Sequence, residues 1–279
     1  EENLNNSIEN LEYSIVEAIR GLAQTKVEKV VFLEGHGELE EHDVYDLTQL
    51  LAQYYQVDRG CLGNEAGVLD GYAAVIIADP QLPFSEEDKY ILDQYIMQGG
   101  RVLWVVNGVK FSSDFLASQG ATPIVALDLD INDMLFRYGV RIRHGLVQDL
   151  QCLPVPVDVS TNPQQPNWQP MPWTYAPLLL TSQQSPITRN IAQLTATMAS
   201  AVELVGGEDG IRKEVLLATS SASKLTAVPA QVNLSMGVDD EQSYQYAYIP
   251  VAVSLEGEFS SLYAHLGAPE SIVASALVR

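Results

Sequence analysis

The sequence predicts an α/β fold, in which a mainly parallel sheet with flanking helices is continued by mixed strands in the second half. Continuous apolar, β-prone runs at residues 30–33 and 73–78 are typical of strands that are covered on both faces. Helical periodicity follows each of these runs, first after Asp43 and again after Ser85. Strands that alternate with helices over short links usually pair in parallel, with helices on both faces of the sheet.

The first half of the chain supplies the elements of this predicted sheet. Strands are expected at residues 30–33, 55–61, 73–78 and 101–106. Asp43 is the expected N-cap of a helix whose apolar positions are Val44, Leu47, Leu50 and Leu51. A second helix is expected to begin after Ser85 and to end at Gly99.

The pattern loosens beyond residue 128. A short helix is expected over residues 130–138, and two extended pieces lie on either side of Gly145. Residues 154–177 hold seven prolines and two tryptophans, which predicts a long ordered loop or an insertion. Further strands are expected at residues 202–205, 214–219 and 246–255. We therefore divide the chain into an N-terminal amphipathic helix (1–26), an α/β core (27–150) and a β-rich second half (151–279) that packs on the same core.

The N-terminal helix offers a surface for self-association. Leu4, Leu11 and Ala18 fall on a heptad, which could pair with a second copy of the chain. Leu4 and Leu11 are therefore candidate partner contacts, and a homo-oligomer is one expected assembly.

Composition excludes several classes of partner. Thirty-six acidic residues against 15 basic ones leave a net charge of −21. This balance argues against binding to nucleic acid and to anionic lipid head groups. The sequence shows neither a run long enough for a membrane span nor a signal peptide. Because the chain opens on Glu1, we interpret it as a piece of a longer protein.

The loop Gly35-His36-Gly37-Glu38 is the first candidate for a ligand site. It follows the first predicted strand, and ligands in open α/β sheets usually lie at the carboxyl ends of the strands. The acidic residues around His36 could hold zinc or manganese, but a solvated acidic loop is the favoured interpretation. We accordingly assign these four residues as ligand-binding candidates and assign no metal, cofactor or catalytic residue.

Several enzyme motifs are missing from the sequence. It has no phosphate-binding P-loop, no Gly-x-Ser-x-Gly elbow, no His-Glu-x-x-His and no Cys-x-x-Cys, and Glu40 stands where a dinucleotide fingerprint needs glycine. Cys61 and Cys152 are the only cysteines, and neither precedes a convincing elbow helix. We favour the interpretation that both are buried free thiols, although a single disulfide bridge between them is also possible. A metal- or thiol-dependent hydrolase centred on His36 stays as an alternative function.

Aromatic residues in the proline-rich segment offer a second surface. Trp168, Trp173 and Tyr175 could contact a partner protein, or they could form the local core that fixes the segment. A carbohydrate-binding module that uses Trp168 and Trp173 is a further alternative.

Several segments carry a resemblance to a known family. They read DINDMLFRYGVRI at 130–142, LVQDL at 146–150, FLEGHGE at 32–38, DQYIMQGGRVLW at 93–104, SPITRN at 185–190 and LEGEFSS at 255–261. Together they cover most of the chain, which resembles the GldG family of gliding-motility-associated auxiliary components of ABC transporters in Bacteroidetes.

The resemblance implies a flavodoxin-like core, similar to class I glutamine amidotransferases, that has lost its nucleophile. Residues 107–110, after the fourth predicted strand, agree because they include no nucleophile. It also implies a non-enzymatic, periplasmic domain of an inner-membrane-anchored protein, whose anchors lie outside this chain. The partners it implies are an ABC permease subunit and, through it, a cytoplasmic ATPase.

Overall fold

The fold was analysed in a computed structural model. It describes residues 11, 15, 16, 19, 27–63, 65–160, 164–165, 167–206, 210–234 and 240–272. Leu4 and Ala18 of the predicted heptad lie outside the described residues. No helix in the described part of the chain is both long enough and apolar enough to cross a bilayer.

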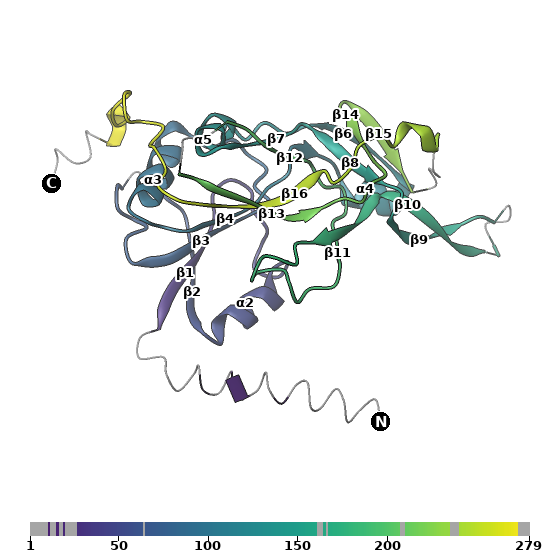
Figure 1. The fold of residues 1–279 in the computed structure, drawn as a ribbon, viewed down its shortest axis with the longest axis horizontal. Coiled ribbons are helices and arrows are strands. Elements are labelled where there is room, and N and C mark those ends of the chain that lie inside the picture. The colour runs from purple at the N-terminus through teal and green to yellow at the C-terminus, as the bar shows by residue number, and fades with distance from the viewer. Residues whose placement is uncertain are drawn as a thin grey trace.

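A four-stranded parallel sheet forms one end of the molecule (Figure 1). Its order is β2 (Tyr55–Gly60), β1 (Glu28–Leu33), β3 (Tyr72–Ala78) and β4 (Val102–Val105). The crossovers carry α2 (Tyr45–Ala52) and α3 (Glu86–Met97). All four strands lie where the sequence predicts them, and β1, β3 and β4 have continuous apolar runs at their centres.

The two faces of this sheet are covered unequally. On one face, Val31, Val75 and Ile77 pack in the same core cluster as Ile91 and Leu92 of α3. Ser85 caps α3 and forms a capping box with Asp88, as the acidic first turn predicts. On the opposite face, Phe32, Ile76 and Ala78 pack against Val44, with Leu39 and Leu51 at the margin. The apolar side chains of α2 are mostly exposed, so this face is the more open one.

The prediction of a mainly parallel α/β fold is wrong for the molecule as a whole. Strands hold 38% of the described residues and helices 19%, and every described strand pairing outside the four-stranded sheet is antiparallel. The later elements are β5 (Val109–Lys110), α4 (Ser113–Gln119), β6 (Ala121–Ala126), α5 (Asn132–Tyr138), β7 (Val140–Ile142), β8 (Gly145–Asp149), β9 (Cys152–Asp158), β10 (Trp168–Thr181), β11 (Leu194–Thr195), β12 (Val202–Leu204), β13 (Arg212–Ala218), β14 (Ser223–Ala227), β15 (Ala230–Asn233) and β16 (Pro250–Glu256). Their links mostly lack the crossover helix that a parallel neighbour requires, so the strands pair antiparallel.

These later strands form several small sheets. The largest has the order β11-β10-β13-β16, with β9 paired to β10. The others are β15-β6-β5, β12-β7 and β14-β8. A second core cluster lies among them and contains Ile124, Leu146, Trp173, Tyr175 and Met198.

The proline-rich segment is a two-stranded ribbon, where the sequence predicts a loop. Strands β9 and β10 pair antiparallel and project from the end of the molecule opposite the parallel sheet (Figure 1). Pro154 pairs with Pro172, and Pro156 pairs with Pro170. Since proline has no N–H, such pairs fit a ribbon only where the backbone nitrogen points away from the partner strand. The prolines are therefore compatible with the ribbon because they occupy alternate positions.

Candidate functional site

The His36 loop is a tight turn held by backbone hydrogen bonds. Gly35 and Gly37 have φ values of 119° and 74°, in the region that favours glycine. The His36 carbonyl accepts hydrogen bonds from the backbone N–H groups of Gln81 and Leu82, both at 2.8 Å. The loop after β1 is thereby joined to the loop after β3.

The His36 ring is buried, and both of its nitrogens contact carboxylates. Its Nδ1 lies 3.1 Å from Glu38 Oε1, and its Nε2 lies 3.1 Å from Asp88 Oδ2 at the start of α3. The ring stacks on Phe84 with a centroid distance of 3.8 Å. Burial alone lowers the pKa of His36, but the hydrogen bonds and charges of Asp88 and Glu38 outweigh it and raise the pKa to about 9.

This geometry fits a structural role for the histidine. An imidazolium between two carboxylates ties the loop to the first turn of α3. Both ring nitrogens are occupied, so neither is free to act as a general base while these contacts hold. Of the four ligand-binding candidates, only Gly37 lines the cavity that opens beside this loop.

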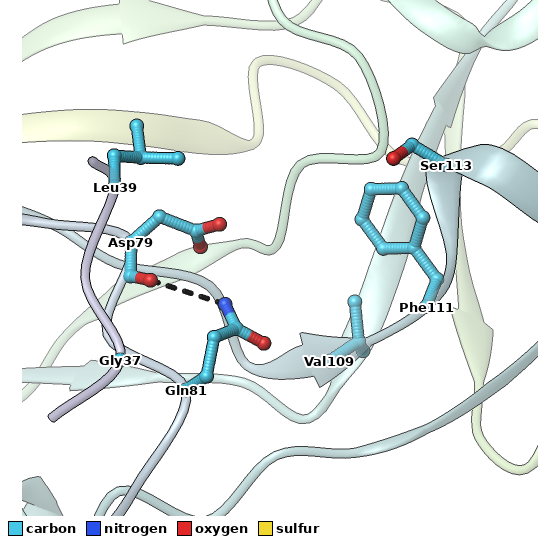
Figure 2. A pocket seen from close by; sticks show the side chains of 7 residues that line it. All are labelled: Gly37, Leu39, Asp79, Gln81, Val109, Phe111 and Ser113. Carbon is cyan, nitrogen blue, oxygen red and sulfur yellow. Dashed lines mark hydrogen bonds between the residues drawn. The ribbon is translucent and has the colours of Figure 1, made fainter. Parts of the chain in front are cut away.

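That cavity lies at the carboxyl edge of the parallel sheet and has a volume of about 200 Å³. Its lining comes from the loops that follow β1 and β3 and from residues 109–113, which run from β5 to the start of α4; it consists of Gly37, Leu39, Asp79, Gln81, Val109, Phe111 and Ser113. Figure 2 shows the Asp79 carboxylate and the Phe111 ring directed into the space from opposite sides. The position agrees with the general rule for ligand sites in open α/β sheets, although the sequence placed the site at His36.

Asp79 is the most unusual residue of the cavity. It directly follows β3 and has a φ of 52°, which is uncommon for a residue other than glycine. Its backbone is fixed, because its N–H donates to Val105 O and its carbonyl accepts from the Gln81 side-chain amide. Within the described part of the chain, no hydrogen bond or ion pair reaches its carboxylate, and burial raises the pKa of that carboxyl.

Sequence reasoning missed Asp79 as a site residue. In the sequence, Asp79 and Pro80 directly follow the apolar run at residues 73–78. The available signal was a carboxylate at the carboxyl end of a buried apolar strand.

Neither the cysteines nor the acidic residues form a reactive centre among the described residues. No group of three or more His, Cys, Asp or Glu side chains is arranged to hold a metal ion there. Both cysteines are free, as favoured, but Cys61 is exposed and Cys152 is only half-buried, so the expectation that both are buried is wrong. Burial and the charge of Asp149 raise the pKa of the Cys152 thiol, which disfavours the reactive thiolate.

The aromatic residues of the proline-rich segment separate into two groups. Trp173 and Tyr175 are buried in the second core cluster, and the Trp173 indole donates to Asn233 O. Trp168 is 63% exposed on the ribbon. Because Trp173 is buried, the two tryptophans do not present a shared surface for a sugar. Leu11, near the other end of the chain, is exposed.

The segment at residues 130–142 has a structural role, because its side chains contact buried polar residues of α3. Asp133 accepts a hydrogen bond from the buried Lys89 at 3.1 Å, and Tyr138 donates to the buried Asp93 at 2.7 Å. Asp93 also accepts from Ser261 Oγ at 2.6 Å and from the backbone N–H of Leu262 at 3.0 Å. Three of the segments that carry the family resemblance, which include residues 93, 138 and 261, thus meet at one buried carboxylate.

Comparison with known proteins gives one family. A family model described as an ABC-type uncharacterized transport system matches residues 28–276. Comparison with curated proteins gives no match. Among solved structures, the chain is similar to the mmIFT52 N-terminal domain, with 14% identity and a TM-score of 0.49 over 90% of this chain and 96% of that one.

Proposed function

The chain belongs to the family of auxiliary components of ABC-type transport systems, and we propose on that premise that it is a non-enzymatic domain that docks on the permease of such a system. ATP hydrolysis belongs to another chain of the complex, because this sequence has no P-loop. The engaged His36 and the half-buried Cys152 support a role in binding rather than in catalysis.

Within this family, we propose that the chain belongs to a transport system of the gliding-motility type. The domain would then lie in the periplasm, with its membrane anchors outside this chain. The six sequence segments that resemble the GldG family support it. Protease added to cells with a permeabilised outer membrane should digest the domain while a cytoplasmic marker survives. Protection of the domain under the same conditions would contradict the periplasmic assignment.

The observation that carries the docking proposal is the exposed face of the β9–β10 ribbon. Side chains alternate across a strand, so the four prolines at 154, 156, 170 and 172 share one face with Trp168. All four prolines and the tryptophan are exposed. Exposed tryptophan with rigid apolar neighbours is typical of residues that anchor protein–protein contacts.

Charge also sets the ribbon apart from the rest of the chain. Residues 152–172 include a single charged residue, Asp158, in a chain whose net charge is −21. The ribbon can therefore approach an apolar surface without desolvating several charges. A permease, which carries apolar surface close to the membrane, is a partner of that chemistry.

The prolines also determine how the ribbon can bind. Its free edges lack N–H donors at four positions, so a partner strand cannot add there with a complete ladder of hydrogen bonds. Docking must use side chains, with Trp168 as the main anchor.

The test is co-purification of this protein with its cognate permease after substitution of Trp168. Trp168→Ala should weaken the complex by about tenfold or more, since central tryptophans commonly contribute that much. Phe136→Ala is the matched control, because Phe136 is also about half exposed but lies on α5. Equal affinities of the two variants would overturn the assignment of the ribbon as the docking surface.

We propose in addition that the N-terminal helix mediates self-association. Leu11, Ile15 and Ile19 are helical, stand four residues apart and are each at least half exposed. Ile15→Glu should lower the mass of the protein measured by analytical ultracentrifugation, if that stripe pairs two copies. An unchanged mass distribution would refute this role.

A further inference from the structure

We propose that the cavity at the carboxyl edge of the parallel sheet binds a small organic ammonium ion with a short hydrocarbon body, held by the Asp79 carboxylate. The proposal concerns a different surface from the docking ribbon, so it does not depend on the proposed function. The other residues that would contact the ligand are Gln81, Leu39, Val109 and Phe111.

The Asp79 carboxylate lines the cavity without a protein partner among the described residues. A partly buried carboxylate normally has a cation or several hydrogen-bond donors beside it. The acids nearby follow this rule, since Glu38 and Asp88 both contact His36. No described residue provides such a partner to the side chain of Asp79, so an ammonium group would supply what the chain does not.

The backbone of Asp79 is held in one position. Its left-handed backbone conformation is held by hydrogen bonds to β4 and to the Gln81 side chain. A less favourable conformation that the surrounding structure holds in place is commonly found at ligand sites. The result is that the carboxylate points into the cavity (Figure 2).

The other walls of the cavity determine which class of ligand fits beside Asp79. Leu39, Val109 and Phe111 provide apolar surface, which calls for a hydrocarbon part, and the Phe111 ring can also attract a cation. Asp79 contributes the single carboxylate of the lining, which is too few ligands for a metal ion. An anion would meet Asp79 and a chain of net charge −21. A neutral apolar ligand would bury the carboxylate without a partner.

The test is a titration followed by two-dimensional ¹H–¹⁵N NMR near neutral pH. The probe is n-butylammonium, and 1-butanol is its neutral isostere. We expect saturable shifts of the backbone amides of Gly37, Leu39 and Gln81 with the ammonium, and binding at least about tenfold weaker with the alcohol.

Asp79→Asn provides the second arm. Asparagine tolerates the left-handed conformation and has the same shape, so the variant should fold normally. It should lose at least about tenfold in affinity for butylammonium. Asp46→Asn, which removes an exposed carboxylate on α2, is the matched control and should bind as the unmodified chain does.

Three results would each overturn the proposal. These are no saturable shift up to about 50 mM probe, equal affinities for the ammonium and the alcohol, and equal losses of affinity in Asp79→Asn and Asp46→Asn. The last result would show attraction to the overall negative charge rather than binding in the cavity.

Discussion

His36 should make the stability of the domain depend on pH in the alkaline range. The pKa of His36 is about 9 in the folded chain, against about 6.5 for a free histidine. A group whose pKa is raised by folding binds its proton more tightly in the folded state. Its contribution to stability is therefore complete below about pH 6.5 and is lost as the pH rises through about 9.

The size of this contribution to stability follows from the difference between the folded and unfolded pKa values of His36. At about 1.4 kcal/mol per pKa unit, the full contribution is about 3 kcal/mol. Between about pH 7 and about pH 9.5, close to 2 kcal/mol of it should disappear. The lowered pKa of Asp88 reports the same ion pair from the other side, so its shift is not added to this sum.

The assay is urea unfolding followed by far-ultraviolet circular dichroism at several pH values. The free energy of unfolding should fall by about 2 kcal/mol more in the unmodified chain than in His36→Gln over this range, because glutamine does not titrate. His42→Gln is the matched control, since the side chain of His42 is 75% exposed. It should follow the unmodified chain.

Two results would contradict the predicted pH dependence. One is a constant difference in unfolding free energy between the unmodified chain and His36→Gln across the whole range. The other is an NMR titration in which His36 has an ordinary pKa near 6.5. Either result would mean that the two carboxylates do not hold an imidazolium in the folded state.

Three further predictions test other parts of the structure. Gly37→Val should destabilise the fold by about 1 kcal/mol or more, because φ is 74° and a Cβ would lie 3.3 Å from Gln81 Cβ; an unchanged melting temperature would contradict this. Asp93→Ala should cost about 3 kcal/mol or more in urea unfolding, because the hydroxyls of Tyr138 and Ser261 lose their acceptor; a loss below about 1 kcal/mol would show that water replaces it. The chain should bind no ATP, and saturable micromolar binding in calorimetry would disprove that.

The parallel sheet could be predicted because its signals are local. Val75 and Ile77 are completely buried, and such strands appear in a sequence as unbroken apolar runs. The cap at Ser85 is equally local, since residue and partner stand three positions apart.

The antiparallel part could not be predicted, because its signals depend on distant residues. Strand β8 is buried at every position, yet it contains Gln148 and Asp149. These polar side chains are satisfied by residues such as Thr174 and Ser220, which come from far along the chain. In β10 the prolines suggest a loop until their pairing with those of β9 is known.

The candidate site was predicted only in part, for a similar reason. The glycines around His36 indicate the turn, and its place after a buried strand indicates the correct edge of the sheet. Which residues line the cavity depends on how the loops after β1 and β3 meet residues 109–113. The lack of a partner for Asp79 is a property of that assembly and not of any short stretch of sequence.

The hydrogen bonds of Asp93 have a consequence for the order in which the chain can fold. Two of its donors, Ser261 and Leu262, lie 168 and 169 residues further along the sequence. While a nascent chain is still on the ribosome, the parallel sheet can be complete in sequence but still lack these donors. Closing α3 over the sheet at that stage would bury a carboxylate with too few partners. Stable folding should therefore wait until residues 261 and 262 have left the ribosome, and a chain that ends before Ser261 should remain a target for proteases.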